Sequence, residues 1–120
     1  MAPTPEAVVQ RQLDAYNARD VDALLATYAP DAELFEHLAK SLARGAAALR
    51  ERFAARFQET NLHAALQRRI VNGNFVIDHE LVTRTFPEGP GTLEVVMIYE
   101  VRGDRIANSW SIPGKKTLTR

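Results

Sequence analysis

The chain has 120 residues, no cysteine and a formal net charge of zero, with 15 Lys plus Arg against 15 Asp plus Glu. This composition excludes disulfides, thiolate metal sites and a cysteine nucleophile. It also argues against nucleic acid or an anionic membrane as the main partner, because phosphate binding requires a basic patch. We expect a single cytoplasmic domain over residues 1–120, without a signal peptide or a membrane span.

Three helices are predicted in the first half of the chain. Pro5 can occupy the first turn of one helix, and Asp20 suits the N-cap of a second helix that ends before Pro30. A third helix follows Gly45. Their apolar positions recur every three or four residues, as on a buried helix face: Val9, Leu13 and Tyr16, then Val21, Leu24, Leu25 and Tyr28, then Leu49, Phe53 and Phe57.

The third predicted helix is also rich in arginine. Arg50, Arg52 and Arg56 lie close together, but helical spacing distributes them among acidic residues. We therefore interpret these three residues as part of a solvated helix face.

Strands are predicted at residues 31–38, 62–71, 74–85, 92–102 and 105–112, with a loop at 40–44. Asn72-Gly73 is a strong hairpin signal, since a type I′ turn needs positive φ at both central positions. Pro113-Gly114 should end the last strand and leave a polar C-terminal tail at 114–120.

This order of elements predicts an α+β fold. Three N-terminal helices should pack on a curved antiparallel or mixed sheet, giving a cone-shaped α+β barrel with an internal pocket and a core over about residues 6–113. A small apolar or aromatic ligand would suit such a pocket.

Three of the predicted strands place an ionisable or hydroxylic side chain on a face that is otherwise apolar: Glu36, His79 and Tyr99. Successive strand side chains alternate between faces, so all three should point inward. A buried carboxylate is costly unless it is paired or protonated, so an inward Glu36 indicates a lined pocket and a raised pKa. Each residue also has a non-functional interpretation. Glu36 could lie at a solvated strand end, and His79 could be a histidine at the edge of the core, hydrogen-bonded to the backbone or to Tyr99. Tyr99 could be buried for packing alone.

The other sheet face also carries aliphatic residues. The aliphatic residues predicted for this face are Val76, Val82, Val96 and Ile98, and they lie among the charged residues Asp78, Glu80, Arg84, Glu94 and Glu100. Four aliphatic side chains on a face not covered by helices would be a liability unless a second copy buried them. We therefore expect a homodimer that packs through the outer sheet face.

Several segments together resemble a known superfamily. They are residues 20–32, Gly45 with the following helix, Asn72-Gly73 with His79-Glu80, and residues 99–106 with Trp110. Their order and spacing over residues 6–113 resemble the nuclear transport factor 2-like superfamily, and within it the polyketide cyclase (SnoaL-like) and ketosteroid isomerase-like branch.

This resemblance implies roles for three positions. Ketosteroid isomerases of the superfamily shuttle a proton with a carboxylate late in the first strand, where this sequence has Glu36. They hold the substrate oxyanion with a tyrosine on the first helix and a protonated acid on the third long strand, where this sequence has Gln12 and Met97. Glutamine can donate a hydrogen bond and methionine cannot, so that oxyanion hole is incomplete.

The sequence thus supports two functional hypotheses. In the first, the chain is a cofactor-independent proton-transfer enzyme, of the isomerase or cyclase type, acting on an apolar carbonyl compound. Glu36 would be its base, His79, Tyr99 and Gln12 its hydrogen-bond donors, and the ligand would contact Tyr16, Tyr28, Phe53, Ile77 and Met97. In the second, the same fold is a non-catalytic ligand-binding or dimerisation module.

The position of Trp110 stays open, because strand parity does not decide whether its side chain lines the pocket or lies on the dimer face. No metal site is predicted, because His37 and His63 have no metal-ligand spacing with Glu36, His79 or Glu80.

Overall fold

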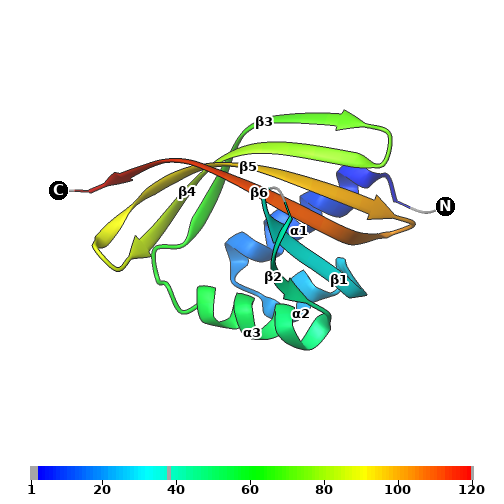
Figure 1. Cartoon of the computed structure of the whole chain (residues 1–120), viewed down its shortest axis with the longest axis horizontal. Coiled ribbons are helices and arrows are strands. Elements are labelled where there is room, and N and C mark those ends of the chain that lie inside the picture. Colours follow the sequence, from blue (N-terminus) through cyan, green and yellow to red (C-terminus); the bar gives the residue numbers. More distant parts are fainter. Residues whose placement is uncertain (1–2, 38, 120) are drawn as a thin grey trace.

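Three helices cover one face of a curved six-stranded sheet in the computed structural model, which describes residues 3–37 and 39–119 (Figure 1). The helices are α1 (Pro5–Ala18), α2 (Val21–Leu25) and α3 (Ala46–Arg56). The strands are β1 (Tyr28–Glu36), β2 (Lys40–Arg44), β3 (His63–Asn72), β4 (Phe75–Phe86), β5 (Gly89–Arg102) and β6 (Arg105–Leu118). No helix in this part of the chain has the length and apolar character needed to span a bilayer.

The sheet is mixed and open. Its neighbours follow the order β2-β1-β6-β5-β4-β3, so β2 and β3 form the two edges. β1 runs parallel to β6, and every other neighbouring pair is antiparallel. The predicted α+β architecture with helices on a curved sheet is confirmed, in its mixed form.

Local sequence signals define the ends of α1. The Thr4 hydroxyl accepts a hydrogen bond from the Ala7 amide at 3.2 Å, and Pro5 lies in the first turn, where an N–H is not needed. Arg19 closes the helix in the left-handed conformation, with φ of 54°. The buried face is apolar except for Gln12, which therefore projects toward the sheet among Val8, Val9, Leu13, Ala15 and Tyr16.

Helix α2 is shorter than predicted. Asp20 caps it as expected, accepting from the Ala23 amide at 3.1 Å, but the helix ends at Leu25. Tyr28, predicted to extend its apolar face, is instead the first residue of β1 and pairs with Ile106 of β6. The Tyr28 side chain is nevertheless buried, as predicted.

Residues 40–44 form an edge strand, whereas the sequence predicted a loop. This short strand, β2, pairs antiparallel with β1, with Leu34 opposite Ala43 and Glu36 opposite Lys40. Two polar residues, two apolar ones and an arginine follow one another in this five-residue strand, so it lacks the alternation from which a strand is recognised.

The turn between β3 and β4 lies one residue later than predicted. Asn72 pairs with Phe75, so the two-residue loop is Gly73-Asn74. Gly73 has a positive φ of 60°, and neither Asn72 nor Asn74 does. The predicted type I′ turn, which needs two positive φ values, is therefore not formed.

Strand β3 carries a bulge near its middle. Leu66 pairs with Glu80 and Arg68 pairs with His79, which leaves Gln67 as an extra residue. A bulge bends its strand and reverses the alternation beyond it. Arg69 consequently lies on the inner face, directly opposite Asp78.

Strand β6 continues through Pro113-Gly114, where the sequence predicted its end and a polar tail. It pairs with β5 as far as Leu118, which lies opposite Gly91. A Cβ atom at Gly91 would lie 2.4 Å from the Thr117 carbonyl oxygen, so the close approach of these strands requires glycine at this position. The register shifts between Leu93 and Val95, opposite Pro113, and such an irregularity is a place where a strand tolerates proline.

Candidate functional site

The inner face of β4 carries two acidic residues. Val76, Asp78, Glu80 and Val82 are buried, whereas the sequence predicted the opposite parity, with His79 pointing inward. His79 lies on the outer face, where its Nε2 is 2.8 Å from Glu94 Oε1 and its side chain is 41% exposed. Both faces of β4 carry apolar residues, so alternation alone favoured the wrong one.

Two predicted ligand contacts also lie away from the inner face. Ile77 has the parity of His79 and pairs with Ile98 of β5. Trp110 pairs with the other side of Ile98, and its ring stacks on Phe35 at a centroid distance of 5.7 Å. Both side chains therefore belong to the outer sheet face. The β5 residues predicted for the outer face do lie there. The prediction is wrong for the β4 residues, which lie on the inner face: Val76, Asp78, Glu80, Val82 and Arg84.

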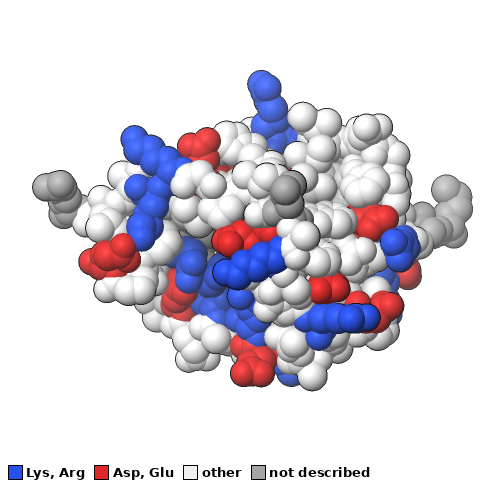
Figure 2. Space-filling model, in the orientation of Figure 1, with Lys and Arg blue, Asp and Glu red and all other residues white. Residues whose placement is uncertain are grey.

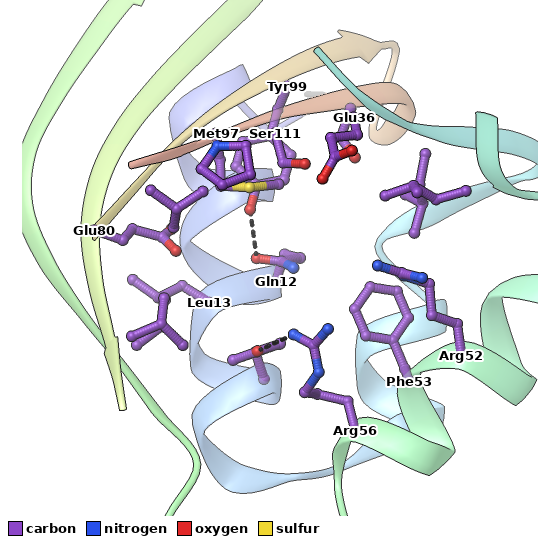
Figure 3. A pocket seen from close by; sticks show the side chains of 18 of the residues that line it. Gln12, Leu13, Glu36, Arg52, Phe53, Arg56, Glu80, Met97, Tyr99 and Ser111 are labelled. Atoms are coloured by element: carbon purple, nitrogen blue, oxygen red, sulfur yellow. Dashed lines mark hydrogen bonds between the residues drawn. The ribbon is translucent and has the colours of Figure 1, made fainter. Parts of the chain in front are cut away.

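A cavity of about 250 Å³ lies between α1, α3 and the inner face of the sheet (Figure 3). Aromatic and aliphatic side chains share its wall with polar and charged ones, a combination that suits a small-molecule site. The residues that the sequence placed at the pocket and that line this cavity are Gln12, Tyr16, Tyr28, Glu36, Phe53, Met97 and Tyr99. His79, Ile77 and Trp110 are not among its lining residues.

Gln12 connects two buried tyrosines at the cavity wall. Its Nε2 donates to the Tyr28 hydroxyl at 3.3 Å, and its Oε1 accepts from the Tyr99 hydroxyl at 3.5 Å. Burial raises the pKa of both phenols, so both stay protonated. The Tyr28 oxygen accepts from Gln12 and keeps its own proton available for a ligand.

Glu80 is a buried acid on the β4 side of the cavity, across from Glu36 (Figure 3). Its residue is 5% exposed, and its Oε2 has no hydrogen-bond partner among the described residues. Burial, together with the negative charge of Asp78, raises the pKa of Glu80 to about 8, although Arg69 partly opposes this. Glu80 is therefore mainly a neutral carboxylic acid at pH 7, able to donate a hydrogen bond into the cavity.

Asp78 differs from Glu80 because it has a partner. Arg69 donates to it through Nε at 2.7 Å and through Nη2 at 2.9 Å, and a third guanidinium hydrogen bond goes to Gln10 at 2.8 Å. The fork geometry satisfies both carboxylate oxygens. One guanidinium thus neutralises one of the two acids, and the second acid stays protonated.

Glu36 is half-buried at the end of β1, on the inner face of the sheet, and approaches the cavity from β1. One cross-strand row of the inner face runs from Glu36 through Ser111, Met97 and Asp78 to Arg69, and Glu80 lies in the next row. Three strand spacings separate β1 from β4, roughly 14 Å of backbone. Glu36 and Glu80 therefore approach a ligand from opposite sides and do not share a proton.

The α3 end of the cavity is basic. Arg52 and Arg56 of α3 and Arg84 of β4 line it, whereas the sequence interpretation placed Arg52 and Arg56 on a solvated face. Arg50, the third arginine predicted for a solvated face, is exposed, and its Nη2 lies 2.9 Å from Asp22 Oδ1. Figure 2 shows basic side chains gathered above α3, with acidic side chains at their margin.

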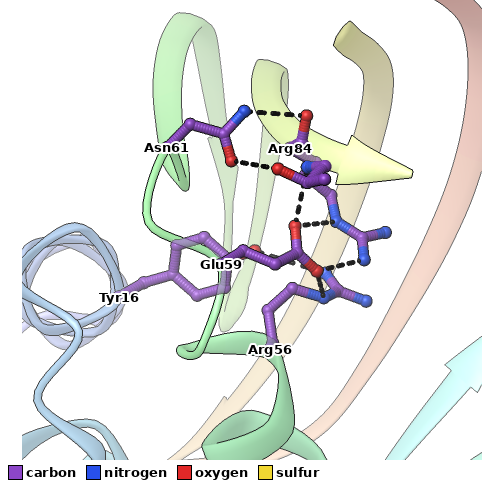
Figure 4. A network of polar contacts seen from close by, with 6 residues as sticks. Tyr16, Arg56, Glu59, Asn61 and Arg84 are labelled. Atoms are coloured by element: carbon purple, nitrogen blue, oxygen red, sulfur yellow. Dashed lines mark hydrogen bonds and ion pairs between the residues drawn. The ribbon is translucent and has the colours of Figure 1, made fainter. Parts of the chain in front are cut away.

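Glu59 contacts two of these arginines, Arg56 and Arg84 (Figure 4). It accepts from Arg84 at 3.2 and 2.7 Å and from the Thr85 amide at 3.0 Å. Burial opposes its ionisation, but these hydrogen bonds outweigh burial and lower the pKa of Glu59. Arg56 lies 3.8 Å from Glu59 and donates to the Tyr16 hydroxyl at 3.3 Å.

Sequence reasoning missed Glu80, Arg52 and Arg56. The two arginines flank Phe53 on α3, one turn apart, and this i, i+4 spacing beside an aromatic core residue was the available signal. For Glu80 the signal was weaker, since it depended on the parity of β4. The arrangement as a whole offers a carboxylate, a neutral acid and a phenol around one apolar space.

The model of the SnoaL-like domain family matches residues 9–109 of the chain. No curated protein matches it significantly. The solved structures that it resembles include a cystatin-fold protein of Novosphingobium aromaticivorans, with 25% identity and a TM-score of 0.84 over 92% of this chain and 98% of that one.

Two further structures carry functional names. A proposed polyketide cyclase of Sinorhizobium meliloti is 27% identical, with a TM-score of 0.72 over 88% of this chain and 93% of that one. A proposed ketosteroid isomerase of Kribbella flavida is 15% identical, with a TM-score of 0.78 over 97% and 82% of the two chains. The second likeness concerns the fold alone.

Proposed function

We propose that this chain, which belongs to the SnoaL-like domain family, binds a small apolar carbonyl compound in its cavity and moves a proton on it, as an isomerase or a cyclase does. One observation carries the proposal. Glu36 and the buried acid Glu80, whose pKa is about 8, line opposite sides of the same largely apolar cavity. A carboxylate base and a neutral donor suffice for proton transfer next to a carbonyl group.

In this proposal Glu36 is the general base. Its carboxylate removes a proton from the carbon beside the carbonyl, and the electron pair of that C–H bond moves onto the carbonyl oxygen as an enolate. Return of the proton from Glu36 to another carbon of the conjugated system gives an isomer. Attack of the enolate carbon on a second carbonyl of the same molecule would instead close a ring, and the proton held by Glu36 would pass to the alkoxide oxygen that forms.

Glu80 and Tyr28 supply the hydrogen bonds to the enolate oxygen. In the resembling isomerases a protonated acid occupies the position of Met97, which has no proton to donate. Glu80 lies one strand away on the same inner face, with an unpartnered buried oxygen and a pKa that keeps it protonated at neutral pH. A neutral acid that donates to a developing oxyanion stabilises it more than it stabilises the ground-state carbonyl.

A deuterium-exchange experiment tests the proposal. 2-Tetralone or 3-cyclohexen-1-one is incubated in D₂O with the protein, and NMR follows deuterium entry beside the carbonyl. Wild type should accelerate exchange, and Glu36→Gln should lower the acceleration by about 10²-fold or more, the contribution of a general base. The rate should also fall as the pH rises through about 8, because Glu80 then loses its proton.

The matched control is Glu33→Gln, which changes an acid of the same strand that is absent from the cavity lining and lies 4.0 Å from Arg44. Exchange by Glu36→Gln at the wild-type rate would refute the role of Glu36. Binding of the ketone without any accelerated exchange would favour the non-catalytic module instead.

We also propose that a second copy of the chain covers the outer sheet face. An apolar row crosses five strands there: Ile70, Ile77, Ile98, Trp110 and Phe35. Both charge signs surround this row, from Arg68 and Arg102 to Glu94 and Glu100. In a two-fold contact each charge can face its opposite in the partner, so the surface is suited to itself.

A further inference from the structure

The α3 end of the cavity carries more positive than negative charge. Three guanidinium groups line it, Arg52, Arg56 and Arg84, whereas the acidic residues of the lining are Glu36 and Glu80, of which Glu80 is mainly neutral at pH 7. Glu59 beside them compensates one further charge. The whole chain has no net charge, so this excess is local.

The three arginines differ in how well their charges are satisfied. Arg84 donates two hydrogen bonds to Glu59, and Arg56 contacts Tyr16 and Glu59. Within residues 3–37 and 39–119, Arg52 makes no side-chain hydrogen bond or ion pair. Arg52 is thus a half-buried cation directed into the cavity beside two other cations (Figure 3).

Electrostatics agree with this geometry. Burial and the charges of Arg56 and Arg84 lower the pKa of Arg52, and the opposing charge of Glu36 does not compensate for them. A guanidinium is the side chain best suited to a bidentate contact with a planar carboxylate. Arg52 and Arg56, one helical turn apart on α3, can reach the same anion from adjacent positions.

We infer that the ligand of the cavity is an acid: a carboxylate at one end binds Arg52 and Arg56, and an apolar body bearing the carbonyl group extends past Phe53 toward Gln12, Tyr28 and Glu80. The inference rests on the proposed function, since it specifies the substrate class of that same site. It narrows the substrates to oxo acids or aromatic acids. Neutral ketones of the same size should bind more weakly.

Calorimetric titration with two unreactive probes tests the inference. 2-Naphthoate and 2-naphthamide have nearly the same shape, and only the first is charged at pH 7. Wild type should bind 2-naphthoate about 10- to 100-fold more tightly than 2-naphthamide, the usual gain from charge-assisted hydrogen bonds. Part of this preference should be lost at 0.5 M salt.

Two variants locate the effect. Arg52→Met keeps the aliphatic length of the side chain and should lower the affinity for 2-naphthoate much more than the affinity for 2-naphthamide, so that most of the preference is lost. The matched control is Arg50→Met, which removes a cation of the same helix that pairs outside the cavity with Asp22. It should leave the affinities of both probes unchanged.

Equal affinity for the two probes in wild type would overturn the inference, as would an unchanged preference in Arg52→Met. It would also be overturned if neither 2-naphthoate nor the smaller benzoate bound up to its solubility limit. The probes carry no exchangeable proton beside a carbonyl group, so the result is independent of the deuterium-exchange experiment. Either proposal can fail while the other stands.

Discussion

Replacing Glu80 with glutamine isolates the energetic effect of the buried acid. Glutamine matches the shape of glutamic acid and keeps one donor and one acceptor, but it cannot ionise. Because Glu80 is buried beside Asp78, its charged form is disfavoured in the folded protein, which is why its pKa is about 8 instead of the usual 4.5.

The sign of the effect follows from proton linkage. Below pH 4.5 Glu80 is neutral in both the folded and the unfolded chain and contributes no pH dependence. Between pH 4.5 and about 8 the unfolded chain releases this proton while the folded chain keeps it, so the free energy of unfolding falls as the pH rises. The rise of the Glu80 pKa from 4.5 to about 8 corresponds to a loss of about 5 kcal/mol in the free energy of unfolding. This is an upper value, because water that enters the cavity would reduce the pKa shift.

Urea denaturation of wild type and Glu80→Gln at pH 5, 7 and 9 measures this difference. The two proteins should have similar stability at pH 5, and the variant should be more stable by several kcal/mol at pH 9. Glu51→Gln, at an exposed acid of α3, controls for the loss of one negative charge. The same pH dependence in wild type and Glu80→Gln would refute the reasoning.

Two further predictions concern other parts of the sheet. Asp78→Asn leaves the buried guanidinium of Arg69 without its charged partner, so urea denaturation should give a free energy of unfolding lower by about 3 kcal/mol. Because the charge of Asp78 raises the pKa of Glu80, NMR titration of the variant should also find a lower pKa for Glu80. No change in either quantity would contradict the role of Asp78 as an ionised partner of Arg69. Ile98→Arg places a charge in the middle of the outer apolar row and should convert a dimer to a folded monomer by light scattering, whereas a wild-type chain that is already monomeric would rule out the homodimer.

The elements that the sequence predicted well are those with signals inside a few residues. Thr4-Pro5 and Asp20 mark helix starts through contacts with the next turn, and the long strands from β3 onward are rich in β-branched and aromatic residues and are separated by turn residues. The edge strand β2 lacked such a signal, and β6 passes through Pro113-Gly114 because of its pairing with Gly91 of β5, which local sequence does not reveal.

The candidate site was predicted in part for the same reason. Glu36 and Tyr99 lie on strands whose inner faces are plainly apolar, and both line the cavity. On β4, Ile77 and Leu81 made the outer face the more apolar one, so His79 was preferred over Glu80. The deciding contact is the pairing of Asp78 with Arg69 across the β3 bulge, a relation between two strands that alternation within one strand does not encode.

The same bulge has a consequence for how the chain behaves at high concentration. β3 is an outermost strand, and apart from Ala64, whose N–H and C=O bond to the Asn17 side chain, its backbone edge could template the addition of a foreign strand, the first step of fibril growth. The extra residue at Gln67 interrupts the regular spacing of amide and carbonyl groups midway, and the exposed cation of Arg68 follows at once. An incoming strand could therefore pair along only half of this edge, which should keep the protein dispersed where an uninterrupted ribbon would polymerise.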